Sequence, residues 1–390
     1  MSEIGTATVR QEDSVRRILI VAGEASGDRY GAGLIRAIRL QVPGVQFTGI
    51  GGRCMREAGL DPLMDTERIA VLGFFEVLTT LPRIHRALNR CIAELDTRPD
   101  LVLLIDYPTF NLRLAKRAAA AGIPVVYFVS PQIWAWKPGR IKAIAEAVQQ
   151  MLVIFPFEEK FYSDRGVKAT FVGHPLLEIL KTQGPRLSRG EAAERFGLDA
   201  QRRIIGLLPG SRMKEVRRNL PPILGAARRL RKRFPDLQFL MPVASTLTRD
   251  GVAAMVDLPG VVFTEGGFYE ALNMCEVAAV SSGTATMEVG LLGVPMVVVY
   301  RLHPLTYGVG RHMTHLDTFG MVNLVAGSRI VPELIQNECT PEKIADALTE
   351  LLSDRVLYER TRRNLRALKS KLGGGGAFDK AARVIMEALR

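Results

Sequence analysis

The sequence lacks the features of several protein classes. Its four cysteines, Cys54, Cys91, Cys275 and Cys339, form no CxxC pair, so we expect neither a disulfide framework nor a zinc site, and a reducing cytoplasm is the default. No uninterrupted apolar run reaches the roughly 18 residues that span a bilayer. Residues 1–16 are polar and lack the apolar core of a signal peptide.

Common nucleotide-site motifs are also missing. The Gly-rich turns do not match GxGxxG, GxSxG or the P-loop, and no DxD occurs anywhere in the chain. Motifs alone therefore indicate no dinucleotide enzyme, no hydrolase elbow and no ATPase. We expect no metal site and no cofactor.

Size and charge narrow the remaining classes. The chain has 390 residues, 47% of them hydrophobic and 24% charged, which suits a globular protein of two domains. Its net charge of +12 favours polyanionic partners, namely nucleic acid, anionic membrane or phosphorylated ligands. The basic residues gather at 212–233 and 355–371, in predicted helices, without an aromatic single-strand platform or finger motif. Solvated helix faces explain most of this charge, and nucleic acid is not an expected partner.

Short apolar runs alternate with helical patterns along the chain. Such runs are typical of parallel sheets covered on both faces, and a second series begins at Ile204 after a predicted linker, Thr182 to Gly190. We predict an α/β fold with two doubly wound, Rossmann-like domains that face a cleft. The predicted parts are a first domain at 17–180, a second domain at 190–365 and C-terminal helices at 366–390 that pack back on the first domain.

One turn in the second predicted domain organises the rest of the chain. An apolar strand, 277–280, runs into Ser281-Ser282-Gly283-Thr284-Ala285-Thr286-Met287-Glu288 and then a helical pattern. At such a helix start the backbone N–H groups of Gly283, Thr284 and Ala285 would face a ligand, and an anion such as a diphosphate is favoured there. Glu288 lies about one turn further on, where its carboxylate could accept hydrogen bonds from a ribose. The alternative is a well-capped helix in an ordinary βα unit.

The first domain repeats this arrangement. The strand 17–22 is followed by Gly23-Glu24-Ala25-Ser26-Gly27-Asp28 and a helix, although Ser26 and Asp28 could merely cap that helix. Asp106 follows the strand 101–105, where chemistry in an open sheet is expected. A carboxylate there could remove a proton from a hydroxyl, or it could simply cap the next helix.

The second domain begins with a complementary basic residue. Leu208-Pro209-Gly210-Ser211-Arg212 brings an arginine to the start of a helix, where its guanidinium could grip a diphosphate through two hydrogen bonds. A base on one domain and an anion site on the other match what sugar transfer from a nucleoside diphosphate requires. With no DxD sequence, Arg212 and the helix dipole would take the place of a metal ion.

Residues 69–90 and the two tryptophans suggest surfaces for an apolar ligand. Phe74 and Phe75 precede a helical pattern rich in Arg and His, which is typical of an interfacial membrane contact, and the alternative is a core helix with its charged face in water. Trp134 and Trp136 suit a rigid loop beside a binding cleft. His174 could line the same cleft, although a lone histidine beside proline is more often structural.

At this point four segments resemble a known family. Residues 21–28, 129–136, 208–212 and 282–288 are similar to the signatures of lipid-A-disaccharide synthases, and they occur in the family's order. The resemblance implies an inverting glycosyltransferase of the GT-B fold in lipid A biosynthesis. It would transfer 2,3-diacylglucosamine from UDP-2,3-diacylglucosamine to 2,3-diacylglucosamine 1-phosphate, giving the β-1,6-linked disaccharide 1-phosphate and UDP.

The resemblance also implies roles and a location. Asp106 would be the base for the acceptor 6-hydroxyl, and the chain departs from the family pattern nearby at Thr109 and, before Asn323, at Val322. A cytoplasmic enzyme with these lipid substrates would work peripherally at the inner face of the anionic inner membrane, and a homodimer is left open. The donor-binding residues carried over are Arg212, Ser282, Gly283, Thr284, Ala285, Glu288 and Asn323, with first-loop contacts from Gly23, Glu24, Ser26 and Gly27, and with Phe74, Phe75, Trp134 and Trp136 toward membrane and acceptor.

Two rival functions follow from the same residues. Another enzyme of this architecture, such as a UDP-N-acetylglucosamine 2-epimerase or a peptidoglycan-type glycosyltransferase, could use the same anion turn. A basic nucleic-acid-binding protein is the alternative of another class, and it would show steeply salt-dependent binding to DNA or RNA.

Overall fold

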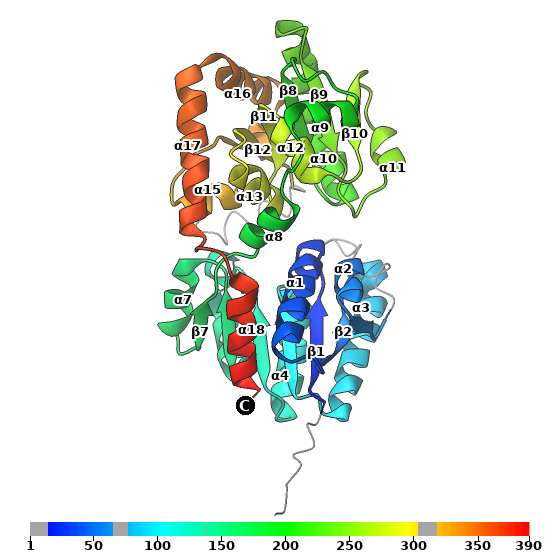
Figure 1. Cartoon of the computed structure of the whole chain (residues 1–390), viewed down its shortest axis with the longest axis vertical. Helices are drawn as coiled ribbons and strands as arrows, with labels where there is room; N and C mark the ends of the chain where they lie inside the picture. Colours follow the sequence, from blue (N-terminus) through cyan, green and yellow to red (C-terminus); the bar gives the residue numbers. More distant parts are fainter. Residues whose placement is uncertain (1–14, 65–76, 137, 303–317, 390) are drawn as a thin grey trace, which may run out of the picture.

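The structure, a computed structural model, describes residues 15–64, 77–136, 138–302 and 318–389. It has two lobes stacked along the long axis of the molecule (Figure 1). Each lobe is built on a parallel sheet with helices on both faces. The prediction of two doubly wound α/β units is confirmed.

The first sheet has seven parallel strands in the order β3-β2-β1-β4-β5-β6-β7. Its two central strands, β1 and β4, are apolar and almost fully buried, as expected for strands with helices on both sides. The strands are β1 (Arg17–Ala22), β2 (Gln46–Ile50), β3 (Leu60–Pro62), β4 (Leu101–Ile105), β5 (Val125–Phe128), β6 (Gln150–Val153) and β7 (Ala169–Phe171).

The second sheet has six parallel strands in the order β10-β9-β8-β11-β12-β13. Its central strands β8 and β11 are buried along their whole length. The strands are β8 (Ile204–Leu208), β9 (Gln238–Pro242), β10 (Val261–Thr264), β11 (Val277–Ser281), β12 (Met296–Tyr300) and β13 (Glu333–Ile335).

Helices connect the strands and cover the sheets. Those of the first lobe are α1 (Ala25–Gln41), α2 (Arg53–Glu57), α3 (Val77–Glu94), α4 (Pro108–Ala120), α5 (Ile133–Trp136), α6 (Ile141–Ala147) and α7 (Pro156–Ser163). The rest are α8 (Leu176–Gln183), α9 (Arg189–Phe196), α10 (Met213–Arg233), α11 (Arg249–Ala253), α12 (Phe268–Met274), α13 (Thr284–Leu291), α15 (Met321–Ala326), α16 (Pro341–Ser353), α17 (Arg355–Lys371) and α18 (Ala377–Ala388).

The chain crosses between the lobes at two neighbouring points. The first crossing follows β7, and α8 then lies between the lobes; the second lies between α17 and α18 (Figure 1). The backbone N–H of His174 donates to the carbonyl of Leu372 at 3.0 Å, so the two crossings touch. After the second crossing α18 packs against α1 of the first lobe. The chain therefore leaves the first lobe ahead of α8, upstream of the predicted linker, Thr182 to Gly190.

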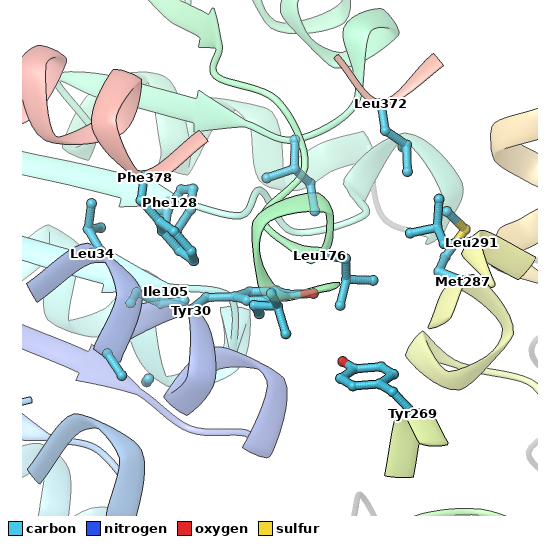
Figure 2. Packing of buried hydrophobic residues seen from close by; sticks show 14 of the residues in the cluster. Tyr30, Leu34, Ile105, Phe128, Leu176, Tyr269, Met287, Leu291, Leu372 and Phe378 are labelled. Atoms are coloured by element: carbon cyan, nitrogen blue, oxygen red, sulfur yellow. The ribbon is translucent and has the colours of Figure 1, made fainter. Parts of the chain in front are cut away.

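A continuous apolar cluster joins the two lobes. Figure 2 shows Leu176 of α8 between Tyr30 of α1 and the side chains of Met287 and Leu291 on α13, with Tyr269 of α12 nearby. All five side chains are buried. Burial of apolar surface stabilises their contact by about 25 cal/mol per Å². The lobes are thus packed against each other, and side chains from both meet at the junction.

Candidate functional site

The predicted site loops follow the strands at which each sheet reverses its order. In the first sheet this point lies between β1 and β4, and in the second between β8 and β11. Loops after such strands diverge to opposite faces and leave room for a ligand at the carboxyl edge. The loops after β1 and β4 carry Glu24 and Asp106, and those after β8 and β11 carry Arg212 and Gly283.

Asp106 stands in an unusual backbone turn at the end of β4. Both Asp106 and Tyr107 have left-handed backbones, with φ of 48° and 49°, a conformation that costs free energy for residues other than glycine. The Nδ2 of Asn111 donates to the carbonyls of Ile105 and Asp106 at 3.2 and 2.7 Å, and the Tyr127 hydroxyl donates to the Asp106 carbonyl. These bonds hold the strained turn and fix where the Asp106 side chain starts.

The environment of Asp106 favours its protonated form. Burial and the carboxylate of Glu24 raise the pKa of Asp106 to about 7, although a backbone hydrogen bond from Tyr107 and the charge of Arg212 lower it. Charges from both lobes therefore act on this carboxyl. A carboxylate whose pKa lies near neutral pH is well matched to act as a general base.

The ring of Tyr107 leaves no room for a side chain at position 23, so this position needs glycine. A Cβ at Gly23 would lie 2.4 Å from the ring of Tyr107, which is much closer than atoms normally approach. The first loop and the Asp106 turn are therefore in direct contact. Gly23 and Tyr107 also line a small apolar pocket together with Val21, Ile50, Ile84, Ala87 and Phe110.

Arg212 forms an ion pair across the junction. It is the N-cap residue of α10, and its Nη2 lies 3.0 Å from Oε1 of Glu24 in the other lobe. Its Nη1 lies 3.3 Å from Oε1 of Glu215. Burial opposes the charge of Arg212, but these two carboxylates more than offset that effect and raise the pKa of Arg212 above its ordinary value. Arg212 thus already holds an anion where the sequence predicts a diphosphate.

Asn219 of α10 ties the loop that carries Arg212 to the ends of β11 and β12. The Nδ2 of buried Asn219 donates to the carbonyl of Pro209 and to Oγ of Ser281, both at 3.0 Å. Its Oδ1 accepts from the backbone N–H of Arg301 at 2.9 Å. One amide therefore fixes the ends of β8, β11 and β12 relative to one another.

The turn before α13 is open to solvent. Gly283 has a φ of 149°, which favours glycine, and a Cβ there would meet no atom within 4 Å. No side chain caps α13, and Gly283 and Thr284 are exposed, while Ala285 is partly buried. A helix start of this kind is a suitable place for an anion.

Glu288 is held by a residue from the other lobe. Its carboxyl is buried, and Oε1 accepts from Nη2 of Arg29 at 2.9 Å and from the hydroxyl of Tyr269 at 2.9 Å. Arg29 also donates from Nη1 to the Tyr269 hydroxyl at 3.1 Å. Burial disfavours the charge of Arg29, yet Glu288 and Tyr269 raise its pKa above the ordinary value.

Ser282 and Asn323 take part in a buried network beside this turn. Ser282 Oγ donates to the Phe319 carbonyl at 3.0 Å. Asn323 donates to the Val331 carbonyl at 2.9 Å and to Glu333 at 2.7 Å, and its Oδ1 accepts from two backbone N–H groups. In this structure Asn323 therefore supports the neighbouring loop, and direct contact with a donor stays a prediction.

The remaining first-loop residues have different roles. Asp28 accepts from the backbone N–H groups of Cys54 and Met55, both at 3.0 Å, so it caps α2 and not α1. The alternative in which Asp28 caps its own helix is therefore wrong. Ser26 is partly buried and Gly27 is buried at the start of α1. Both lie next to Glu24, beside the junction.

Trp134 packs on a buried carboxylate. Its segment forms the short helix α5 and not the loop that the sequence suggested. Trp134 Nε1 donates to Oε1 of Glu158 at 3.1 Å, and Ser130 Oγ donates to the same oxygen at 2.6 Å. Burial raises the pKa of Glu158 to about 7 despite these hydrogen bonds. The side chain of Trp136 lies outside the described part of the structure, as do Phe74 and Phe75.

His174 has a structural role. It is buried, its ring packs against Tyr30 and Phe155, and its Nδ1 accepts from the backbone N–H of Leu176 at 3.2 Å. Burial lowers the pKa of His174 to about 3, so the ring is neutral at physiological pH. It does not line an open site.

The structure brings Glu24, Asp106, Arg212 and Glu288 to the junction between the lobes. The sequence alone did not indicate Arg29 and Tyr269, which bind Glu288, Asn219, which holds the loop of Arg212, or Glu158, which binds Ser130 and Trp134. Only Glu158 had a local signal, because a glutamate three residues after a helix start often caps that helix, and here it accepts from the backbone N–H of Phe155 at 3.1 Å.

Two classes of site are absent from the part of the chain that the structure describes. Among those residues no group of three or more His, Cys, Asp or Glu side chains is arranged to hold a metal ion. Within the same ranges, no helix is both long and apolar enough to cross a membrane.

Comparison with known proteins identifies relatives over almost the whole chain. A family model described as lipid-A-disaccharide synthetase matches residues 18–375. The lipid-A-disaccharide synthase of Geobacter sulfurreducens is 45% identical over 384 residues, which cover 97% of this chain and 98% of the relative. That of Myxococcus xanthus is 42% identical over 377 residues, covering 96% and 97% of the two chains.

Solved structures with the same fold are more distant in sequence. The S. aureus MnaA–UDP co-structure has a TM-score of 0.69 at 12% identity and covers 96% of this chain and 97% of its own. A glycosyltransferase of kitacinnamycin has a TM-score of 0.60 at 18% identity and covers 96% and 99%. These similarities show the fold alone, which is that of GT-B glycosyltransferases and related epimerases.

Proposed function

Because the chain belongs to the lipid-A-disaccharide synthetase family, its activity is the glycosyl transfer that forms the lipid A disaccharide, and we propose that Asp106 is the base of this reaction. The donor proposed is UDP-2,3-diacylglucosamine and the acceptor 2,3-diacylglucosamine 1-phosphate. The observation that carries the proposal is that Arg212 of the second lobe lies 3.0 Å from Glu24 of the first lobe, the carboxylate that also acts on Asp106. The proposed base and the proposed leaving-group site therefore lie at one junction.

The proposed mechanism divides the work between the lobes. The ionised carboxylate of Asp106 removes the proton from the acceptor 6-hydroxyl as its oxygen attacks the anomeric carbon, and the bond to the UDP oxygen breaks with inversion. Negative charge then develops on the departing diphosphate. Arg212 and the start of α13 stabilise that charge, because a guanidinium and exposed helix amides both bind phosphate oxygens.

Glu24 occupies the place proposed for the diphosphate. Its carboxylate lies 3.0 Å from Arg212, so the donor would replace one anion by another on the same guanidinium. Such an exchange keeps the charge of Arg212 compensated before and after binding. Glu288 would receive the ribose, Ser282 to Ala285 would surround the phosphates, and Asn323 would support them.

The lipid substrates require contact with a membrane surface, and we propose α3 for this role. Arg83, His85, Arg86 and Arg90 are exposed on α3, whereas Ala87, Leu88 and Cys91 are buried on its inner face. Basic residues near an anionic surface contribute about 1 kcal/mol each. The apolar pocket beside Tyr107 and α3 would lie next to an acyl chain. Contact with membrane or acceptor by Phe74, Phe75, Trp134 and Trp136 stays part of the proposal.

The reaction is tested by product analysis. Purified protein is incubated with UDP-2,3-diacylglucosamine, with and without the monophosphate acceptor, and products are identified by mass spectrometry. Disaccharide 1-phosphate and UDP should appear only with acceptor. An epimerase would convert the sugar nucleotide alone, which is the result that would overturn the assignment.

The role of Asp106 is tested by Asp106→Asn. This variant should bind UDP with wild-type affinity by calorimetry and lose transfer by about 10²- to 10⁴-fold, the usual contribution of a general base. Wild-type turnover would remove Asp106 from the mechanism.

Membrane contact is tested with anionic liposomes. The double variant Arg83→Gln/Arg86→Gln should sediment less, by roughly 30-fold in partition coefficient, if each arginine contributes about 1 kcal/mol. The matched control is Arg360→Gln/Arg363→Gln, the same charge change at exposed positions of α17 in the second lobe. Equal losses for both pairs would mean that only net charge matters, and α3 would not be the contact. Phe74→Ser/Phe75→Ser should also weaken sedimentation without unfolding.

A further inference from the structure

Arg29 is the one first-lobe side chain whose hydrogen bonds, among the described residues, reach the carboxylate proposed to bind ribose. It lies on the first turns of α1, whereas Glu288 lies on α13 and Tyr269 on α12, both in the second lobe. The three groups form a closed triangle of hydrogen bonds, with all three donor–acceptor distances between 2.9 and 3.1 Å.

These bonds leave one edge of the carboxylate for a ligand. Within the described residues, the hydrogen bonds that Arg29 and Tyr269 donate to Glu288 both go to Oε1. A carboxylate accepts about four hydrogen bonds through its two oxygens. Arg29 and a ribose diol can therefore bind Glu288 at the same time, and Arg29 need not be displaced.

The buried position of Glu288 makes such a partner necessary. Glu288 is 5% exposed, and a buried carboxylate without a partner carries a large cost and can turn away from its ligand. Arg29 supplies a charge-assisted bond to Glu288 that fixes the orientation of its carboxylate. No motif of the sequence assigns a role to Arg29. It directly follows residues 21–28, the segment that resembles the family signature, and lies within α1.

We propose that Arg29 is a positioning residue that completes the nucleoside subsite from the opposite lobe, by holding Glu288 in the orientation that accepts the ribose diol. The inference rests on the proposed role of Glu288. It follows that the ribose-binding carboxylate is set only while the lobes are together, so that donor binding and lobe closure favour each other.

The test compares two nucleotides that differ only in the diol. Binding of UDP and of 2′,3′-dideoxy-UDP is measured by calorimetry on full-length protein. Arg29→Leu should weaken UDP binding by about tenfold or more, as expected for a hydrogen bond to a charged group, and change binding of the dideoxy nucleotide by less than about twofold. Arg29→Lys should recover part of the loss, and it serves in place of Arg29→Leu if that variant does not fold.

A matched control and a double variant complete the test. Arg36 lies on the same helix and is exposed, so Arg36→Leu should leave both affinities unchanged. In the Glu288→Gln background, Arg29→Leu should add less than about twofold to the loss of UDP affinity, because the two residues act as one unit.

Three outcomes would overturn the inference. Equal losses for both nucleotides in Arg29→Leu would assign Arg29 a purely structural role. Loss of diol preference in Glu288→Gln but not in Arg29→Leu would remove Arg29 alone and leave the donor site in place. Wild-type diol preference in Glu288→Gln would remove both residues from the nucleoside subsite, while the transfer reaction itself is decided separately by its products.

Discussion

Replacing Asp106 by asparagine should stabilise the protein at alkaline pH while it abolishes transfer. Burial and Glu24 raise the pKa of Asp106 to about 7 in the folded protein, whereas an unfolded aspartate has a pKa of about 3.9. The folded chain therefore binds this proton more tightly than the unfolded chain. The contribution of Asp106 to the free energy of unfolding therefore falls as pH rises from about 4 to about 7, and it is constant above that range. Asparagine is neutral at every pH and avoids this loss.

The magnitude follows from the width of that pH window. At pH 5 and above the unfolded aspartate is ionised, whereas the folded carboxyl keeps its proton up to its pKa of about 7. The two states therefore differ over about two pH units between pH 5 and pH 8, and each unit corresponds to about 1.36 kcal/mol. The advantage of Asp106→Asn over the wild type should therefore grow by at most about 3 kcal/mol between these two pH values, and partial exposure of the carboxyl reduces that figure. Glu158 also has a raised pKa, but it is present in both proteins and largely cancels in the difference.

The assay is urea unfolding of wild type and variant at pH 5 and pH 8, followed by tryptophan fluorescence. Asp61→Asn is the matched control, because Asp61 is an exposed aspartate in the same lobe. The control should show no pH-dependent gain. An Asp106→Asn variant that is less stable than wild type at pH 8, or equally affected at both pH values, would refute the account of Asp106 as a carboxyl held in an unfavourable environment.

Two further predictions concern the first loop. Glu24→Gln removes a negative charge that raises the pKa of Asp106. The acid limb of the pH profile of kcat/KM for the acceptor should therefore move to lower pH. A limb that stays in place or moves upward, measured from pH 5 to 9, would contradict this. Gly23→Ala places a methyl group 2.4 Å from the Tyr107 ring and should cost about 1 to 3 kcal/mol of stability together with most of the activity. Gly44→Ala is the control, because a Cβ there meets no atom within 4 Å. Thermal melting should show that this change has almost no effect on stability. Equal losses of stability for the two changes would refute the steric explanation.

The sequence predicted the fold and the positions of the main loops because both depend on local patterns. Continuous apolar runs identify buried parallel strands, and small residues after a strand identify turns before helices. Four such turns, those containing Glu24, Asp106, Arg212 and Gly283, follow the strands where the two sheets reverse order. The strand order itself had no local signal, yet the structure places all four turns where the sheets reverse order.

What the sequence could not predict depends on contacts between distant segments. The pairing of Arg29 with Glu288 joins residues 259 positions apart and exists only because the lobes pack together. Donor contact by Asn323 stays a prediction, but the hydrogen bonds that its amide donates to Val331 and Glu333 had no signal in the sequence. Side-chain hydrogen bonds of this kind are set by tertiary packing, and no periodicity in the sequence records them.

The division of the site between lobes explains how one architecture supports different reactions. The second lobe supplies a guanidinium at Arg212 and an open helix start after Gly283, and these groups suit the diphosphate of any sugar nucleotide. What the first lobe presents then decides the chemistry, because a fold does not determine a reaction. Here it presents a carboxyl in a left-handed turn that Asn111 and Tyr127 hold rigid, beside an apolar pocket. An acylated sugar that reacts through a hydroxyl group needs both a base and an apolar surface, so these first-lobe features are where selectivity for a lipid acceptor should reside.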